Sequence, residues 1–572
     1  MTHQAEKESF HLKSLYISII LILVLFISGL KLVNLDADPP PWFTDELGFK
    51  IDEGYKTLSP RNLAIFGETH WNPEDQYRGW MTNSAITQWP YYWSFRIFGS
   101  ELRNARMVSI FYFALFTLGA AWFLWRRASP KVAIIGVVLL ASDPGMFMFS
   151  RSALFETGLT LFTYFPLFIL FSTSTAGSLI NIATYIFLIS TAYFYLKKTI
   201  LIYACPSVLA LAYSWARQSL FKNIPEWICL STIAFIGAIF LAVIIHYNPW
   251  IIGKINTNAL SYGPQSLLLN PIHTLSPLAL MVGYIVLLEV LFRQPSAIFE
   301  DNYRLCLTAI SVFAPMAFAL FTYNYPRYYI PILPAAILLL VERLSMQLPE
   351  TYYQKHTSSF LQWSLIFLTF FALTMTVLAT VNFYILNNIP FNIGGDPGLS
   401  VIGLYKVFPF AFIIFIIFLY FFIRPIWLKF GTPIIATLTI CHILCGLSMG
   451  YFALFEPTYQ SKNVQSQLIN IVGPNGTVGG DWAPFFAKDT ALKALYMRPY
   501  SNNGTRASLL RPDFFLDSAS PYDQKTLTQL REQEDLRLSS AVPLGAYANH
   551  VISLYRIIYL DEPNLPKATI KK

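Results

Sequence analysis

Charged residues are scarce in this chain. Asp, Glu, Lys and Arg make up 13% of its 572 residues, and 55% are hydrophobic, whereas soluble domains carry about 25% charged residues. This composition excludes an ordinary soluble protein and predicts a polytopic α-helical membrane protein. The net charge of +8 does not indicate nucleic-acid binding, because Lys and Arg gather in the cytoplasmic loops of membrane proteins.

Cysteine is also rare. The five cysteines all lie in or beside apolar runs. Cys441 and Cys445 share one helix face, but the only nearby candidate metal ligand is His442. We therefore interpret the cysteines as small apolar packing residues. Because none follows residue 456, we expect the C-terminal part to fold without disulfides.

Several familiar motifs are absent. The sequence has no Gly-x-x-x-x-Gly-Lys-Ser/Thr phosphate loop, no Gly-x-Gly-x-x-Gly and no His-Glu-x-x-His. A nucleotide-dependent cytoplasmic activity therefore has no visible site. No short-period internal repeat is found either, which excludes a solenoid.

Long apolar runs dominate what is present. The first is too long for a signal-peptide core and has no small-residue cleavage site before Asp36, so we expect an uncleaved span with a cytoplasmic N-terminus. Thirteen such spans would place the C-terminus outside. The expected spans are about 14–33, 105–125, 132–150, 153–172, 178–196, 199–216, 227–246, 273–292, 304–322, 330–346, 360–385, 402–423 and 431–454.

The basic residues test this topology. Most of them fall in the predicted cytoplasmic loops, as the positive-inside rule requires. The exceptions stand at the predicted outer ends of spans and therefore raise a functional question. They are Arg151, Lys197, Lys198, Lys254 and Arg327.

The first outer loop, residues 34–104, contains the acidic sequence Asp52-Glu53-Gly54-Tyr55. Asp52 suits a helix N-cap, and Glu53 would then lie in the first turn, where the helix dipole favours anions. From spacing alone, Asp52 could be no more than the cap of a surface helix.

The chain changes character after residue 455. We divide it into a transmembrane module, 1–455, and a small extracytoplasmic α/β domain, 456–572. Segments 468–473 and 550–555 alternate like strands, whereas 490–497 and 523–537 have helical patterns.

A second acid, Glu156, is predicted at the outer end of the fourth span. An acid inside an apolar helix is costly and needs a partner or a function. Arg151 is close enough in sequence to be a structural ion-pair partner, and Asp143 adds a third acid near the same membrane edge.

The outer cations could bind an anion. Lys197, Lys198 and Arg327 are predicted at the level of Asp52 and Glu156, where they could hold a phosphate of the membrane interface. The alternative is that they extend to lipid headgroups, as any outer lysine can do.

Together these motifs resemble the membrane glycosyltransferases of the GT-C type that use polyprenyl-phosphate sugars. Relatives in this group are the protein O-mannosyltransferases and the lipid A aminoarabinose transferases. The resemblance covers the N-terminal third well, the middle loosely and the tail weakly. It depends on Asp52-Glu53-Gly54-Tyr55, Arg61–Gly67, Gln88–Trp93, Ala105-Arg106-Met107, Ser150–Glu156 and Pro326-Arg327-Tyr328-Tyr329-Ile330-Pro331.

The resemblance implies a GT-C fold of about 13 transmembrane helices and an inverting enzyme in the cell (inner) membrane. It would transfer a sugar from undecaprenyl- or dolichyl-phosphate to an acceptor hydroxyl of a lipid, glycan or protein. Asp52 would be the general base, Glu53 would shape its pKa or the acceptor site, and Glu156 would orient the site. The implied substrate-binding residues are Tyr55, Arg151, Lys197, Lys198, Arg327 and Tyr328.

Two departures from the family pattern bear on this interpretation. Glu156 stands where the family often has Asp, and segment 81–88 lacks the basic residue often found there, with Arg78 the nearest substitute. No cofactor is expected with certainty. A divalent cation could bridge Asp52 and Glu156, but cationic side chains alone can neutralise a leaving monophosphate.

The alternative function is a multi-pass transporter or lipid flippase. That class is expected to place broken helices and charges near the bilayer midplane, whereas the predicted charges here gather at one edge. The C-terminal domain would either bind the acceptor or cover the cavity.

Overall fold

The computed structural model describes residues 2–39, 49–71, 79–172, 179–219, 276–320, 326–346, 360–381, 433–448, 450–497, 510–547 and 550–560. The expected spans at 227–246 and 402–423 lie outside these residues, as do Arg78 and Lys254.

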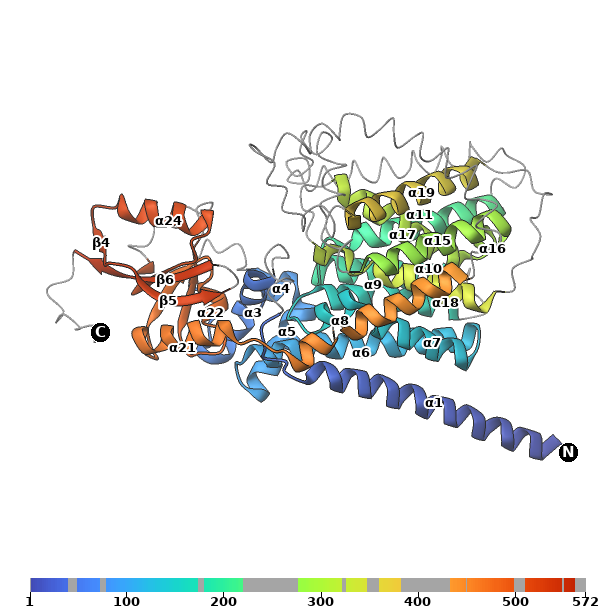
Figure 1. The fold of residues 1–572 in the computed structure, drawn as a ribbon, viewed down its shortest axis with the longest axis horizontal. Helices are drawn as coiled ribbons and strands as arrows, with labels where there is room; N and C mark the ends of the chain where they lie inside the picture. Colours follow the sequence, from blue (N-terminus) through green and yellow to red (C-terminus); the bar gives the residue numbers. More distant parts are fainter. Residues whose placement is uncertain are drawn as a thin grey trace.

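Apolar helices form the larger part of the described chain. Four are long and apolar enough to cross a membrane: Ser14–Leu32, Leu102–Arg127, Arg327–Ser345 and Pro433–Phe455. The first belongs to α1 (Thr2–Leu32), which extends away from the rest in Figure 1 and exposes Leu25 and Phe26. Apolar side chains exposed along such a helix fit a lipid environment. The count of thirteen spans stays a prediction.

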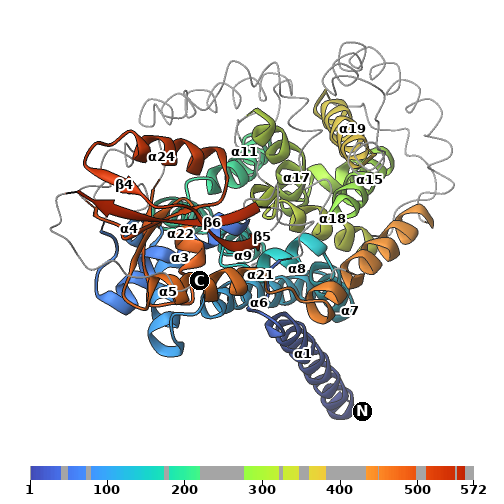
Figure 2. The same ribbon diagram turned by 60° about the vertical axis from the view of Figure 1, so that its left-hand side comes forward.

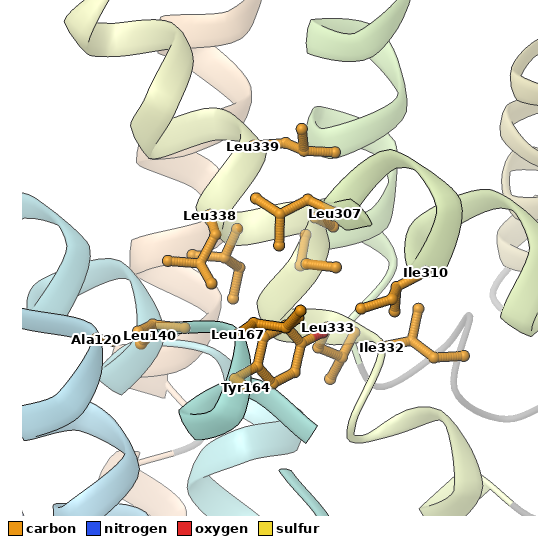
Figure 3. Packing of buried hydrophobic residues seen from close by; sticks show 14 of the residues in the cluster. Ala120, Leu140, Tyr164, Leu167, Leu307, Ile310, Ile332, Leu333, Leu338 and Leu339 are labelled. Atoms are coloured by element: carbon orange, nitrogen blue, oxygen red, sulfur yellow. The ribbon is translucent and has the colours of Figure 1, made fainter. Parts of the chain in front are cut away.

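Helices α6 (Leu102–Arg127) and α9 (Glu156–Ser172) pack against each other in one part of the bundle, whereas the helices between Pro277 and Val381 pack mainly against one another. Tyr164 of α9 donates its hydroxyl to Pro331 O at 2.7 Å. Figure 3 shows Tyr164 and Leu167 close to Ile332 and Leu333. The other helices are α7 (Pro130–Ala141), α8 (Pro144–Ser150), α10 (Leu179–Tyr195), α11 (Ile200–Ser219), α15 (Pro277–Arg293), α16 (Ser296–Phe299), α17 (Asn302–Leu320), η2 (Pro326–Tyr329), α18 (Leu333–Ser345) and α19 (Phe360–Val381).

The span predicted over 132–150 is divided between two helices, α7 and α8. Helices α7 and α8 meet there at a bend of 70°. Pro144 cannot continue the hydrogen bonding of α7, and Asp143 accepts a 2.7 Å hydrogen bond from Met146 N as the N-cap of α8. The sequence Ser142-Asp143-Pro144 therefore ends one helix and starts the next.

The end of the bundle far from the C-terminal part carries buried ion pairs. Arg127 Nε lies 2.7 Å from Glu342 Oε1, and Arg304 Nε lies 2.9 Å from Glu342 Oε2. Arg343 pairs with the fully buried Glu289 at 2.7 Å. These arginines, predicted as cytoplasmic, therefore also join helices to one another.

The first loop is largely helical. It contains α3 (Phe49–Phe66), α4 (Trp80–Asn83) and α5 (Ala85–Phe98). Because α3 begins at Phe49, the prediction of Asp52 as an N-cap is wrong, and Asp52 lies within the first turn. An acid in the first turn still interacts favourably with the helix dipole.

The C-terminal residues form an α/β unit around a six-stranded sheet, at the opposite end of the molecule from the start of α1 (Figures 1 and 2). Strand β1 pairs in parallel with β2 and β3, and β6 pairs antiparallel with β3, β4 and β5. The elements are α21 (Gln460–Val472), β1 (Thr477–Gly480), α22 (Ala483–Phe486), β2 (Lys493–Tyr496), β3 (Phe514–Asp517), α24 (Pro521–Arg531), β4 (Leu536–Leu538), β5 (Val542–Tyr547) and β6 (His550–Tyr559).

Local patterns misassigned part of this unit. The strand predicted at 550–555 is confirmed as part of β6, but 468–473 belongs to α21 and its cap, not to a strand. The helix predicted at 490–497 is wrong, because β2 occupies half of it, and the helix predicted at 523–537 ends at Arg531. In β2, pairing with β1 overrides the helix propensity of its Lys, Ala and Leu residues.

Candidate active site

Asp52 and Arg327 meet although 275 positions separate them in the sequence numbering. The Asp52 carboxylate forms an ion pair with Arg327 Nη1, and the two side chains are 18% and 9% exposed. Asp52 belongs to helix α3 and Arg327 to the 3-10 helix η2. Arg327 Nε also lies 3.7 Å from Glu156 Oε1, so the guanidinium group stands between two carboxylates.

Glu156 is fully buried at the first position of α9 and is surrounded by cations. Lys197 Nζ lies 2.6 Å from Glu156 Oε1, and Lys56 Nζ lies 3.5 Å from Glu156 Oε2. Lys197 comes from the short connection between α10 and α11. Buried charge of this kind is tolerated only when it is paired.

The predicted pairing of Arg151 with Glu156 is wrong. Arg151 instead donates hydrogen bonds of 2.8–3.0 Å to the backbone oxygens of Lys31, Val33 and Asn34. Carbonyl groups at a helix C-terminus lack partners within the helix, so Arg151 satisfies the end of α1. The prediction was wrong because it was based on the short distance between the two residues in the sequence.

The cluster carries unequal charge. Asp52 and Glu156 contribute two negative charges, whereas Lys56, Lys197 and Arg327 contribute three positive ones. Among these five described residues, one positive charge is in excess in a partly buried setting. Such a site is suited to an anion, because charge-assisted hydrogen bonds to phosphate or carboxylate are strong.

Sequence reasoning missed the role of Lys56. It follows Asp52 by four positions on α3, so the two side chains share one helix face, and this spacing was the available signal. Burial lowers the pKa of Lys56 to about 8 despite the opposing effect of Glu156. For Lys197, burial also acts to lower the pKa, but the Glu156 carboxylate outweighs it and the pKa is raised.

Glu53 turns away from this cluster into a second ion pair. Its carboxylate receives bonds of 2.9 and 2.7 Å from Arg106 of α6, and a 2.7 Å bond from Ala153 N. Arg106 also donates to the backbone oxygens of Leu35 and Ala37, at 2.6 and 2.7 Å. Because Glu53 and Arg106 are 1% and 3% exposed, Glu53 holds the start of α3 against the bundle. Arg106 belongs to one of the motifs that carry the family resemblance, but its pairing with Glu53 was not predicted.

The other predicted substrate-binding residues differ in position. Tyr328 lies in the cluster: Lys197 Nζ is 4.5 Å and the Arg327 guanidinium carbon is 5.0 Å from its ring centre. Tyr55 lies outside it, with its hydroxyl group against Asp481 of the C-terminal unit. The Lys198 side chain is exposed.

Asp143 is separate from the cluster. Besides capping α8, its carboxylate accepts a 3.0 Å hydrogen bond from Ser276 Oγ and lies 4.0 Å from His442 Nε2. These contacts stabilise the bend between α7 and α8 rather than the site around Asp52.

A divalent cation between Asp52 and Glu156 stays a prediction. Within the described part of the chain, no group of three His, Cys, Asp or Glu side chains is arranged to hold a metal ion. The Asp52 and Glu156 carboxylates face cationic groups instead. The described cysteines Cys205, Cys306, Cys441 and Cys445 are free thiols.

A Gly-x-Ser-x-Gly sequence at 446–450 is not a nucleophile site. It lies inside the helix Pro433–Phe455, whereas the hydrolase motif requires a sharp turn between a strand and a helix. The Ser448 hydroxyl donates to Leu444 O at 2.9 Å, a bond within the helix.

No protein-family model and no curated protein matches the chain. Among solved structures, it is similar to ArnT from Cupriavidus metallidurans bound to undecaprenyl phosphate, with 13% identity, 95% of this chain and 98% of that chain covered, and a TM-score of 0.48. For the apo state of that protein, the identity is 12%, the coverage 96% and 98%, and the TM-score 0.46.

Proposed function

We propose that this chain is a membrane glycosyltransferase that moves a sugar from a polyprenyl phosphate to an acceptor hydroxyl. The observation that carries the proposal is the cluster at the start of α3. There Asp52, the more exposed of the two carboxylates, pairs with Arg327, and Lys56 and Lys197 pair with Glu156. These five described residues together carry an excess of one positive charge. This is also where the sequence motifs predict the active centre.

The charge of the cluster matches such a donor. A sugar joined to a polyprenyl monophosphate is a phosphodiester with one negative charge, equal and opposite to the excess in the cluster. When the bond between the sugar carbon and the phosphate oxygen breaks, that oxygen keeps the electron pair and the phosphate gains a second charge. Lys56, Lys197 and Arg327 are placed to stabilise this charge as it develops.

Asp52 is the proposed general base. The acceptor oxygen attacks the sugar carbon, and its proton passes to the Asp52 carboxylate. Base and phosphate then lie on opposite faces of that carbon, which inverts its configuration. Because Arg327 pairs with Asp52 in the structure, a donor phosphate that attracts Arg327 would release the base only once the donor is bound.

Glu156 has a supporting role in this mechanism. It is fully buried and contacts Lys197, Lys56 and Arg327, so it orders the three cations before the donor arrives. Prior ordering lowers the cost of reorganisation during the reaction. We place the site on the outer face of the cell (inner) membrane, with a cytoplasmic N-terminus.

The role of Lys56 predicts an alkaline limit to activity. Burial lowers its pKa to about 8, so the ammonium group is charged below that pH and neutral above it, while a phosphodiester stays anionic. We expect kcat/KM, which reports the free enzyme, to fall above about pH 8. In Lys56→Arg the guanidinium stays charged, and the fall should move to higher pH.

A matched control for this profile is Lys462→Arg, since Lys462 is 41% exposed and pairs with Asp36. Its profile should equal that of the parent chain. An unchanged alkaline limb in Lys56→Arg would assign the limb to another group.

The function itself is tested by reconstituting the full chain in vesicles with a synthetic polyprenyl-phosphate sugar carrying a radiolabel. We expect label to leave the donor and free polyprenyl phosphate to accumulate with an envelope extract as acceptor. Nucleotide-sugar donors should give no transfer. Movement of intact donor across the bilayer without cleavage would instead support the flippase alternative and contradict the transferase.

A further inference from the structure

The C-terminal unit contacts the back of the helix that carries Asp52. We infer that this unit positions Asp52 for catalysis, through three contacts on α3. The inference rests on the proposed function, because it concerns the residue assigned there as the general base. Figure 1 shows α3 beside α22 and α21 at the junction of the C-terminal unit with the helical bundle.

The first contact is a close approach of backbones at Gly54. A Cβ atom placed on Gly54 would lie 2.6 Å from Phe485 N and 2.7 Å from Phe485 Cα, both in α22. Real Cβ atoms do not come so near to backbone atoms, so this packing requires glycine. Because Gly54 has no side chain, α22 can pack directly against the backbone of α3.

The second contact is a pair of hydrogen bonds from Tyr55. Its buried hydroxyl group lies 2.6 Å from Asp481 O and 2.5 Å from Asp481 Oδ1. Asp481 N in turn donates to Asp523 Oδ1 at 3.0 Å, and Ser518 N donates to Asp523 Oδ2 at 3.0 Å. The tyrosine is therefore bound to a residue that the C-terminal unit itself holds in place.

The third contact is made by Arg61, two turns further along α3. It is 1% exposed and donates to three backbone oxygens in the segment between α22 and β2. These are Lys488 O at 3.2 Å, Leu492 O at 3.0 Å and Thr490 O. One guanidinium group thus holds a connecting segment by carbonyl groups that would otherwise lack partners.

These contacts divide the faces of α3. Asp52 and Lys56 face the charged cluster, and Glu53 is bound to Arg106 of the bundle. Gly54, Tyr55 and Arg61 face the C-terminal unit. Because a helix is stiff over one or two turns, a shift at Tyr55 moves Asp52 as well. Misplacing a catalytic group by about 1 Å can cost on the order of 100-fold in rate.

The test compares two tyrosine variants of the full chain. Tyr55→Phe removes both hydrogen bonds to Asp481 but keeps the ring, which packs on Tyr496 with centres 4.6 Å apart. Tyr559→Phe is the matched control, because its hydroxyl donates to Pro512 O at 3.1 Å within the C-terminal unit. Both are assayed for transfer from the synthetic donor, with kcat and donor KM measured separately.

We expect Tyr55→Phe to lower kcat by roughly 10- to 100-fold with an unchanged donor KM, and Tyr559→Phe to retain the parent kcat. Arg61→Lys, which keeps the charge but cannot reach three oxygens, should lower kcat in the same way. If Tyr55→Phe does not accumulate in membranes, Arg61→Lys takes its place in the comparison.

The inference fails if Tyr55→Phe and Arg61→Lys keep the parent kcat, even when their thermal unfolding midpoint falls, since that is what a purely structural contact would give. It fails too if Tyr559→Phe loses kcat equally. Asp52→Asn is assayed in parallel. Full transfer by Asp52→Asn overturns the assignment of Asp52 as general base, on which the inference rests, whereas loss of transfer in Asp52→Asn alone overturns only the positioning role.

Discussion

Asp52→Asn is expected to lower the rate of sugar transfer by about 10²- to 10⁴-fold, the usual contribution of a positioned general base. The amide has nearly the shape of the carboxylate but cannot accept the proton of the acceptor. The substitution also removes the ion pair between Asp52 and Arg327. Without that ion pair the Arg327 charge acts more strongly on the donor phosphate, so the donor KM should stay equal or fall while kcat falls.

The combination of a lower kcat with an undiminished affinity for the donor separates loss of the base from loss of the site. The matched control is Asp36→Asn in the same loop, since Asp36 is 34% exposed and pairs only at the surface with Lys462. It should transfer sugar at the parent rate. Normal transfer by Asp52→Asn would show that another group takes the proton.

The cluster could be predicted in part because charges are expensive in an apolar chain. That cost indicated Glu156, the positive-inside rule indicated Lys197 and Arg327, and the acidic motif of the first loop indicated Asp52. The structure brings all four together. What could not be predicted was the choice of partners. Arg151 is nearer to Glu156 in sequence, but Lys197 and Lys56, 41 and 100 positions away, are residues that pair with it.

The partners of the acidic motif Asp52-Glu53-Gly54-Tyr55 could not be predicted from the sequence either. The family resemblance implied that this motif is catalytic, with Asp52 as the base and Glu53 acting beside it. In the structure, consecutive residues of a helix point in different directions, so Asp52 faces Arg327, Glu53 faces Arg106, and Tyr55 faces Asp481. Only the three-dimensional partners separate these roles.

The fold was predictable where periodicity is long and apolar, and less so in the C-terminal unit. Four-residue strands such as β1 and β2 are too short to show a clear alternation. They are strands because each pairs with a neighbour from elsewhere in the chain. Such pairing is a tertiary effect that no local window contains.

The second large effect is expected in stability, from Glu53→Gln. Glu53 and Arg106 are both nearly fully buried and joined by two hydrogen bonds. Removing one charge of a buried pair leaves the other without compensation, which costs about 3–5 kcal/mol. The amide oxygen can still accept from Ala153 N, so the loss comes from the stranded guanidinium. Thermal and denaturant unfolding of the detergent-solubilised protein measure this loss of stability.

Two further variants decide whether Glu53 acts through structure or in the reaction. Glu101→Gln breaks an ion pair with Arg103 whose side chains are about half exposed, 50% and 53%, and exposed pairs contribute at most about 1 kcal/mol. Adding Arg106→Met to Glu53→Gln removes the stranded charge and should recover part of the lost stability. If Glu53→Gln instead kept the parent stability and lost transfer, Glu53 would belong to the reaction itself, because a carboxylate that only fastens α3 cannot be removed without cost to the fold.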